Sequence, residues 1–259
     1  MPYPQGTSQE AEAVEVPDYS QVSAEYASSR PTYPPELFEW LAAAVATRGT
    51  AWDTATGNGQ AAWGLAAHFE HVIATDVSAT QLRFARRHPR IEYRVAPAET
   101  SGLAAASVDL AVAAAAIHWF DLRRFYDEVR RVTRRGSVVA AWTYHVAHVA
   151  APLDKVLWPF YRDVVAARFA EGARLVDDRY AGIILPGEQL SAPSFRISVQ
   201  WSAQDVLRFV RTWSGVRSYM AVTRRDPVKD LVDAVEDALG GGDRVRELSW
   251  PVYFRAARL

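Results

Sequence analysis

The first half of the chain alternates between two hydrophobic periods. Helical spacing places Leu37, Leu41 and Val45 on one face after Pro35, whereas residues 107–117 form a continuous apolar run, typical of a strand buried on both faces. We predict strands over residues 50–55, 71–76, 91–96, 107–117 and 137–144, and helices over residues 35–48, 60–68, 78–88 and 121–134. This alternation predicts a doubly wound α/β fold with a mostly parallel sheet and right-handed crossovers.

The regular alternation stops in the second half of the chain. There we predict helices over residues 154–171, 203–220 and 227–239 and strands over residues 195–201 and 251–259. We expect about residues 146–220 to contribute a helical cap inserted after the fifth strand. Residues 1–17 are rich in Pro, Gly, Ser and Glu and cannot bury enough surface to fold alone. We therefore expect a disordered tail there, followed by one folded domain over residues 18–259.

The charge balance and the composition exclude several functions. Twenty-nine basic and 30 acidic residues give a net charge of −1, whereas nucleic-acid-binding proteins normally carry a basic excess. The absence of cysteine removes disulfides, thiolate metal sites and cysteine nucleophiles. The sequence shows neither a membrane-spanning run nor a secretory signal. We therefore expect a soluble cytoplasmic protein without a nucleic-acid or membrane partner.

Gly57 and Gly59 lie at a predicted strand-to-helix turn, and Asp53 precedes them at the strand end. Glycine lets a backbone approach a ligand, and the start of the following helix offers unpaired N–H groups. Asp76 ends the next predicted strand, 23 residues after Asp53, where a carboxylate can accept hydrogen bonds from both ribose hydroxyls of a nucleoside. A helix cap and an ordinary strand-end turn are the alternative interpretation of the same residues.

Residues 57–62 also fit the relaxed fingerprint of dinucleotide-binding proteins, in which alanine replaces the last glycine. Two features disfavour a nicotinamide enzyme. Asp53 lies four residues before the first glycine, where a negative charge suits a cation better than a pyrophosphate. Neither Lys155 nor Lys229, the two lysines of the chain, has a tyrosine four residues before it, which removes one large class of reductases.

Six segments occur in the order in which a known family carries them. They are residues 26–34 (YASSRPTYP), residues 53–59 (DTATGNG), Asp76, Ala98-Glu99, residues 117–121 (IHWFD) and residues 212–214 (TWS). In these segments the chain resembles class I S-adenosylmethionine-dependent methyltransferases, most closely the small-molecule group (methyltransferase type 11) that includes the trans-aconitate methyltransferases. The resemblance extends from about Tyr19 to Leu259, although Ala55 stands where glycine is commoner.

The resemblance implies a Rossmann-like methyltransferase fold, with a seven-stranded sheet whose last strand is antiparallel, and S-adenosylmethionine as the cofactor. The backbone from Ala55 to Gly57 would face the methionine end of the cofactor, Arg30 would pair with its carboxylate, and Asp76 would hold the ribose. The implied cofactor-binding residues are Tyr26, Arg30, Asp53, Ala55, Thr56, Gly57, Gly59, Gln60, Asp76, Val77, Gln81, Ala98, Glu99 and Ala115.

Three residues are candidates for acceptor chemistry. His118 follows the fourth predicted strand, and an imidazole there could act as a general base, although bracing the next loop is the role we favour. A carboxylate acceptor would need no base. Trp119 and Trp213 could wall an aromatic acceptor pocket, or could pack the cap onto the sheet. His145 and His148 lack an evident third ligand, so no metal site is predicted.

We predict direct in-line methyl transfer to an oxygen, or less favourably a nitrogen, of a small organic acceptor. Cytosine-ring methylation needs the cysteine that this chain lacks, and amino-group methylases of nucleic acids carry Asn or Asp before Pro-Pro-aromatic where this chain has residues 117–119. A nicotinamide-dependent oxidoreductase and a non-catalytic S-adenosylmethionine-binding protein are the alternatives. The sequence carries no signal for the identity of the acceptor or for the oligomeric state.

Overall fold

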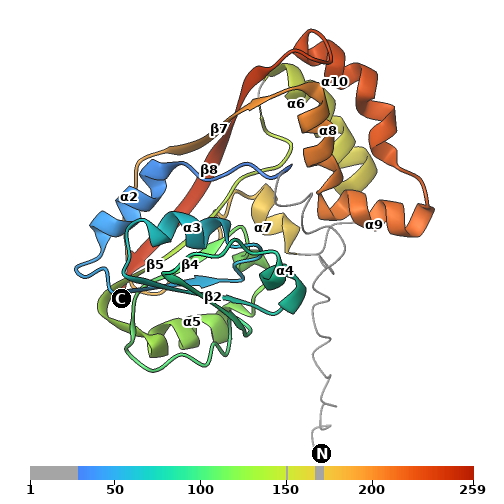
Figure 1. The fold of residues 1–259 in the computed structure, drawn as a ribbon. Helices are drawn as coiled ribbons and strands as arrows, with labels where there is room; N and C mark the ends of the chain where they lie inside the picture. The colour runs from blue at the N-terminus through green and yellow to red at the C-terminus, as the bar shows by residue number, and fades with distance from the viewer. Residues whose placement is uncertain (1–28, 150, 167–171) are drawn as a thin grey trace, which may run out of the picture.

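The computed structural model describes residues 29–149, 151–166 and 172–259, which form a sheet flanked by helices and a second, helical lobe (Figure 1). The predicted disordered tail over residues 1–17 and the predicted cofactor residue Tyr26 lie outside the described residues. No helix of the described part of the chain is long and apolar enough to cross a membrane.

The sheet has the strand order β3-β2-β1-β4-β5-β8-β6, and β7 pairs with β8 off this path. Strands β1 to β5 pair in parallel, whereas β8 runs antiparallel to β5. The strands are β1 (Thr50–Thr54), β2 (His71–Asp76), β3 (Ile91–Val95), β4 (Val108–Ala114), β5 (Thr133–Thr143), β6 (Glu188–Gln189), β7 (Phe195–Trp201) and β8 (Arg246–Arg258). The predicted fold class is confirmed, with the two-residue strand β6 as an addition.

Helices cover both faces of the sheet because each presents one apolar stripe to it. Leu37 and Leu41 of α2 pack with α3 on one face, and Phe125 and Val129 of α5 pack on the other. The helices are α2 (Pro35–Ala44), α3 (Gln60–Ala66), α4 (Ala79–Arg83), η1 (Ile117–Trp119), α5 (Leu122–Val132), α6 (Ala151–Phe160), η2 (Tyr161–Val165), α7 (Ala173–Asp177), α8 (Ala203–Arg211), α9 (Ser214–Thr223), η4 (Pro227–Leu231) and α10 (Val232–Leu239).

Three predicted elements of the second half differ from the structure. The helix predicted over residues 154–171 begins at Ala151 and continues as η2 from Tyr161, and residues 167–171 lie outside the described residues. The predicted helix over residues 203–220 is two helices, because the chain turns at Trp213, whose extended backbone (φ −64°, ψ 133°) precedes α9 and whose side chain is buried. The last strand begins at Arg246 rather than at Pro251, because residues 246–252 also form strand pairs. Their partner is β7 alone. A proline is tolerated in a strand that has one unpaired edge.

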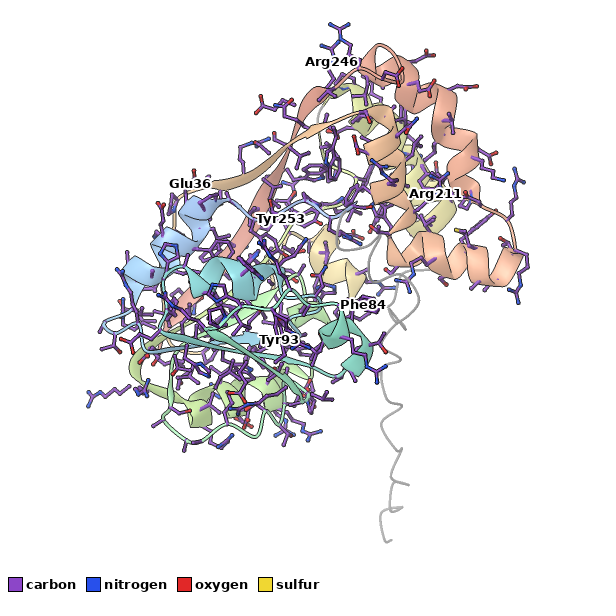
Figure 2. All side chains as sticks on the ribbon, viewed as in Figure 1. Glu36, Phe84, Tyr93, Arg211, Arg246 and Tyr253 are labelled. Atoms are coloured by element: carbon purple, nitrogen blue, oxygen red, sulfur yellow. The ribbon has the colours of Figure 1, made fainter. Side chains whose placement is uncertain are left out.

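Helices α6, α8, α9 and α10 gather in a lobe at the far end of β7 and β8 (Figure 1). Helix α10 packs against α6 and α8, so this lobe also contains residues beyond the predicted cap. Figure 2 shows Arg211 and Arg246 on this lobe and Phe84 and Tyr93 on the sheet lobe. The long strand β8 belongs to both, since it pairs with β7 over residues 246–252 and with β5 over residues 253–258.

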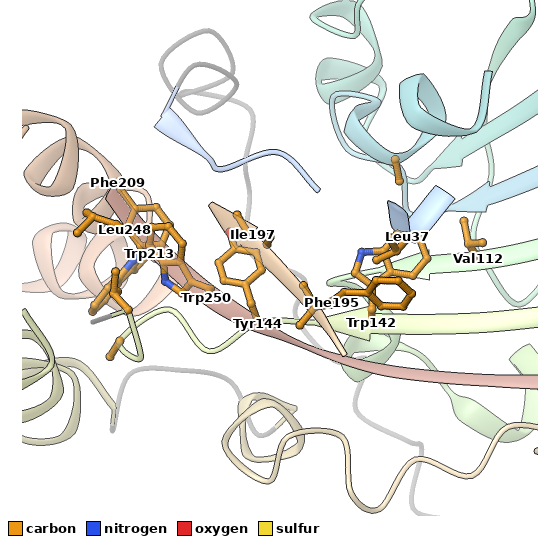
Figure 3. Packing of buried hydrophobic residues seen from close by; sticks show 14 of the residues in the cluster. Leu37, Val112, Trp142, Tyr144, Phe195, Ile197, Phe209, Trp213, Leu248 and Trp250 are labelled. Atoms are coloured by element: carbon orange, nitrogen blue, oxygen red, sulfur yellow. The ribbon is translucent and has the colours of Figure 1, made fainter. Parts of the chain in front are cut away.

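Aromatic packing joins the two lobes into one hydrophobic cluster. In Figure 3 the cluster runs from Trp142 in the sheet, past Tyr144, to Trp250 and Trp213 in the helical lobe. The rings of Tyr144 and Trp250 lie 6.2 Å apart, and those of Trp250 and Phe209 lie 5.5 Å apart. Large buried aromatic side chains dominate the energetics of such contacts. The helical lobe is therefore fixed against the carboxyl edge of the sheet.

Asp109 of β4 ties the chain before β1 to the sheet. Its buried carboxylate accepts hydrogen bonds from Thr47 Oγ1 (2.7 Å), from the Thr50 backbone N–H (2.8 Å) and from Arg134 (2.6 Å). We expect Asp109→Ala to lower the free energy of unfolding by about 2 kcal/mol, because hydrogen bonds from three donors to a buried charged group are lost. Denaturant titration of both variants measures this.

The matched control is Asp127→Ala on α5. Asp127 forms ion pairs with Arg123 and Arg130, but its side chain is 63% exposed. Exposed ion pairs contribute less than about 1 kcal/mol, so this variant should stay close to the parent protein. Equal effects of the two substitutions would contradict the role given to Asp109.

Candidate active site

The turn between β1 and α3 is held in a tight left-handed conformation. Ala55, Gly57 and Gly59 have φ values of 49°, 58° and 87°. Gly59 cannot be replaced without rearrangement, since a Cβ there would lie 2.3 Å from Tyr93 Oη. The Thr56 backbone N–H donates to the Thr75 carbonyl oxygen at 2.9 Å. The turn is therefore anchored to β2, which ends in Asp76.

Asp76 connects the end of β2 to the glycine turn. Its carboxylate accepts hydrogen bonds from the backbone N–H groups of Gly57 and Ser78, each at 2.8 Å. Burial raises its pKa above the ordinary value, although these two hydrogen bonds oppose the shift. Each carboxylate oxygen accepts one of these bonds and keeps a further lone pair. The group can therefore accept two hydroxyl donors of a ribose.

Asp53 lies under the turn and is fully buried. Its Oδ2 accepts a hydrogen bond from Thr56 Oγ1 at 2.5 Å. Burial raises the pKa of Asp53 to about 7, against the opposing effect of the Thr56 hydrogen bond. This carboxyl group therefore titrates close to neutral pH. Its hydrogen bond with Thr56 also stabilises the turn.

The residues predicted to lie beside the adenine gather on the far side of Asp76. The Ala96 backbone N–H donates to the Asp76 carbonyl oxygen at 3.1 Å, which brings the segment after β3 next to β2. Val77 is 54% exposed, and the buried Gln81 Oε1 has no hydrogen-bond partner among the described residues. An exposed apolar side chain and an unsatisfied acceptor, both within five residues of Asp76 in the sequence, are groups that a flat ring with an amino group could use.

Glu99 is placed differently from the other predicted adenine-binding residues. Its carboxylate accepts a hydrogen bond from the backbone N–H of Asp121 at 3.0 Å, directly before α5, while Ala98 is buried. The structure therefore gives Glu99 a role in fixing the start of α5, and its cofactor contact stays a prediction. Gln60 is the first residue of α3, immediately after the turn.

A cavity of about 110 Å³ lies between the carboxyl edge of the sheet and the helical lobe. Ala115 and Thr143 contribute from the ends of β4 and β5. The full lining comprises Arg30, Ala115, His118, Trp119, Thr143, Tyr144, His145, Val146, Tyr161, Ala173, Val176, Trp213 and Ser214. The residues of the glycine turn do not line it. Its lining residue Ala115 directly follows β4, the strand that pairs with β1 before that turn.

Five predicted site residues meet at this cavity, although they are far apart in the sequence. They are Arg30, Ala115, His118, Trp119 and Trp213. The two predicted aromatic wall residues are thus both in the lining, and Trp213 also packs the helical lobe. The lining residues of η2 and α7, such as Tyr161 and Val176, were not predicted. No motif marks them, because they reach the cavity through tertiary packing.

Arg30 holds the chain before α2 against both lobes. Its Nη1 donates to Tyr144 Oη at 3.3 Å, and its Nη2 donates to the Thr212 carbonyl oxygen at 3.0 Å. Its guanidinium also lies 5.4 Å from the centre of the Phe209 ring. Of the described residues that line the cavity, Arg30 alone carries a permanent charge. A cavity whose one fixed charge is positive suits a ligand with an anionic or electron-rich group.

His118 is fixed by Tyr180, a residue that the sequence analysis did not single out. The Nδ1 atom of His118 lies 2.7 Å from Tyr180 Oη, and Tyr180 is fully buried. Burial lowers the pKa of His118 to about 3, so the imidazole is neutral at pH 7. A base this weak has little power to remove a proton from an acceptor. Its predicted role as a base therefore has no support from its surroundings.

His145 is held on both ring nitrogens. Its Nδ1 accepts from the Ala147 backbone N–H at 3.2 Å, so its Nε2–H donates to Asp177 Oδ1 at 3.0 Å. Tyr161 Oη donates to the same oxygen at 2.5 Å. Burial lowers the pKa of His145 to about 4, and the nearby His148 adds to this. The group attaches α7 to the end of β5 and leaves neither ring nitrogen free for a metal.

Comparison with known proteins agrees with this arrangement. Residues 52–141 match a family model described as a methyltransferase domain. A solved structure from Anaeromyxobacter dehalogenans, a proposed type II methyltransferase, is 41% identical, has a TM-score of 0.81, and matches over 88% of this chain and 97% of that chain. A proposed methyltransferase of Dictyostelium discoideum is 27% identical over 242 residues, which cover 91% of this chain and 92% of the relative.

The doubly wound sheet, the glycine turn and the acid at the end of β2 define a nucleoside-binding α/β protein. The similarity over nearly the whole chain makes the class specific: the protein belongs to the class I S-adenosylmethionine-dependent methyltransferases. The nicotinamide-dependent oxidoreductase considered from the sequence is therefore not supported.

Proposed function

We propose that this protein transfers a methyl group from S-adenosylmethionine to an oxygen, or less favourably a nitrogen, of a small organic acceptor in the cavity. The position of the cavity carries the proposal. It lies at the carboxyl edge of the sheet, where open α/β folds bind ligands, and its lining residue Ala115 directly follows β4, the strand next to β1. Side chains of both lobes enclose it, which favours a small molecule over a polymer. The resemblance to the small-molecule group supports the same acceptor class.

The residues around the glycine turn fit the cofactor. Asp76 would accept hydrogen bonds from the ribose hydroxyls, and Gln81 Oε1 would accept one from the adenine amino group while Val77 covers the ring. The turn from Ala55 to Gly57 would lie along the methionine part. When bound, S-adenosylmethionine supplies a methyl group on an electrophilic sulfonium sulfur.

The contribution of this chain to the reaction is then orientation and the exclusion of water. The aromatic rings of Trp119 and Trp213 would hold the acceptor, and the neutral imidazole of His118 would face it. Arg30 would place a positive charge at one side of the cavity. None of these groups needs to form a covalent intermediate with the acceptor, which agrees with a chain that contains no cysteine.

Calorimetric titration tests the cofactor assignment. We expect S-adenosylhomocysteine to bind with a micromolar dissociation constant, which corresponds to about −8 kcal/mol, and NADH not to bind. Binding of NADH without S-adenosylhomocysteine would overturn the proposal. A panel of small carboxylic acids, phenols and amines, incubated with S-adenosylmethionine, then tests turnover. Cofactor binding without turnover of any panel member would favour a non-catalytic binding protein.

A further inference from the structure

We propose that Tyr180 fixes the imidazole of His118 in the Nε2–H tautomer, so that His118 presents a hydrogen-bond donor, and not a base, to the acceptor cavity. The tautomer follows from contacts within the described residues, whereas the role of the donor rests on the proposed function. In this assignment His118 touches the acceptor, and Tyr180 is a positioning residue behind it.

The position of Tyr180 is closely determined. The residue follows α7, and both Arg179 and Tyr180 have left-handed backbones, with φ values of 57° and 55°. The Tyr180 backbone N–H donates to the Leu175 carbonyl oxygen at 2.8 Å, which closes this turn. A non-glycine residue with positive φ is held there by its surroundings. The fully buried ring therefore has little freedom to move away from His118.

The hydrogen-bond capacity of Tyr180 Oη decides the direction of the short contact. A phenol oxygen has one proton to donate and two lone pairs to accept with. Burial raises the pKa of Tyr180 above its ordinary value, against the opposing effect of the Thr143 side chain and the His118 backbone, so the phenol keeps its proton at neutral pH. Within the described residues, the side-chain nitrogen at hydrogen-bond distance from this buried oxygen is His118 Nδ1, 2.7 Å away, so the Tyr180 proton goes there.

The opposite assignment is less favourable. It would require His118 Nδ1–H to donate to Tyr180 Oη, and the Tyr180 proton to go to Thr143 Oγ1. The Thr143 hydroxyl would then have to donate to the Tyr144 carbonyl oxygen, a contact of 3.4 Å. Hydroxyl hydrogen bonds are normally 2.5–3.0 Å long. The chain of hydrogen bonds therefore favours Tyr180 as the donor to His118.

A neutral imidazole that accepts at Nδ1 carries its proton on Nε2. The ring lines the cavity, and its Nε2 has no hydrogen-bond partner among the described residues. An N–H donor at this place fits an acceptor molecule with an oxygen lone pair next to the atom that is methylated. It would orient such a molecule without removing a proton from it. The site therefore selects acceptors that are already nucleophilic at the pH of the reaction.

Nuclear magnetic resonance reads the tautomer directly, without any acceptor. In protein labelled with ¹⁵N-histidine, two-bond ¹H–¹⁵N correlations distinguish a protonated from an unprotonated ring nitrogen, and the signals missing from His118→Gln identify His118. We expect the Nε2–H tautomer in the parent protein and a detectable Nδ1–H fraction in Tyr180→Phe, which keeps the buried ring. An Nδ1–H tautomer in the parent protein would overturn the proposal, as would an unchanged tautomer in Tyr180→Phe.

The donor role has a separate kinetic test with any acceptor that the panel identifies. Glutamine can place an amide N–H near the position of Nε2 but has no basic nitrogen. We therefore expect kcat/KM of His118→Gln to exceed that of His118→Leu at least tenfold, with most of the difference in KM. Equal losses in both variants would show that a donor is not what the site needs. If the parent protein does not bind S-adenosylhomocysteine, the methyltransferase proposal is refuted, whereas the tautomer result still stands.

Discussion

Replacing Asp76 with alanine is expected to weaken the binding of S-adenosylhomocysteine at least 100-fold. The carboxylate would accept two hydrogen bonds from the ribose, and a hydrogen bond to a charged group contributes about 1.5–3 kcal/mol. A loss of about 3 kcal/mol corresponds to a factor of more than 100 in the dissociation constant. The substitution also removes the partner of the Gly57 backbone N–H, so the turn proposed to lie along the cofactor is released.

Calorimetric titration measures this change, and two further variants separate its causes. Asp76→Asn keeps one acceptor oxygen and should fall between the parent protein and the alanine variant. Asp233→Ala, on the exposed side of α10, should bind like the parent protein. A thermal unfolding curve of each variant without ligand shows whether the fold persists. An alanine variant that is folded and binds within threefold of the parent protein would remove Asp76 from the cofactor site.

The cofactor side of the site is predictable from the sequence because it depends on local chemistry. The turn contains positions with positive φ, and the glycines Gly57 and Gly59 in the sequence indicate such a turn. Asp76 is the one charged residue among the buried positions of its strand, so it stands out in the pattern. Parallel strands then bring the ends of β1 and β2 together by their register. The glycine turn and Asp76 are separated in the sequence only by α3 and β2, so local patterns suffice to predict this half of the site.

The acceptor side is not predictable in the same way. His118 and Tyr180 are 62 residues apart, and neither spacing nor periodicity connects them. Asp177 meets His145 and Tyr161 through the packing of α7, which is only five residues long. The turn at Trp213 divides a continuous amphipathic pattern because burying that ring outweighs the continuation of the helix. Tertiary packing decides these positions.

The two lobes are coupled at the cavity through the contacts of Arg30. Its guanidinium bridges Tyr144, at the end of β5, and the Thr212 carbonyl oxygen, between α8 and α9. The same segments carry the aromatic cluster that joins the sheet to the helical lobe. The cavity lining and the lobe packing therefore share residues, so the effect of a substitution in the cavity is best judged from a stability measurement beside the kinetic one.

Asp53 is expected to make the stability of the protein depend on pH near neutrality. Its pKa is raised from 3.8 to about 7 by burial. Between these two values the folded protein keeps the proton that the unfolded chain has lost, so the free energy of unfolding falls as the pH rises from about 4 to 7 and is flat above. Each pKa unit corresponds to about 1.4 kcal/mol, so the full effect is about 4 kcal/mol.

Comparison with Asp53→Asn isolates this effect, because asparagine has nearly the shape of the protonated acid and does not titrate. The acids whose pKa values are lowered, such as Glu128 and Asp205, lose their contributions in acid and are the same in both proteins, so they cancel in the difference. Denaturant titrations at pH 5, 6, 7 and 8 should show the asparagine variant gaining about 3 kcal/mol relative to the parent protein across this range. A difference in the free energy of unfolding that is the same at every pH does not change this pH-dependent gain. Parallel curves would show that Asp53 is already ionised at pH 5 and that burial under the glycine turn does not hold its proton.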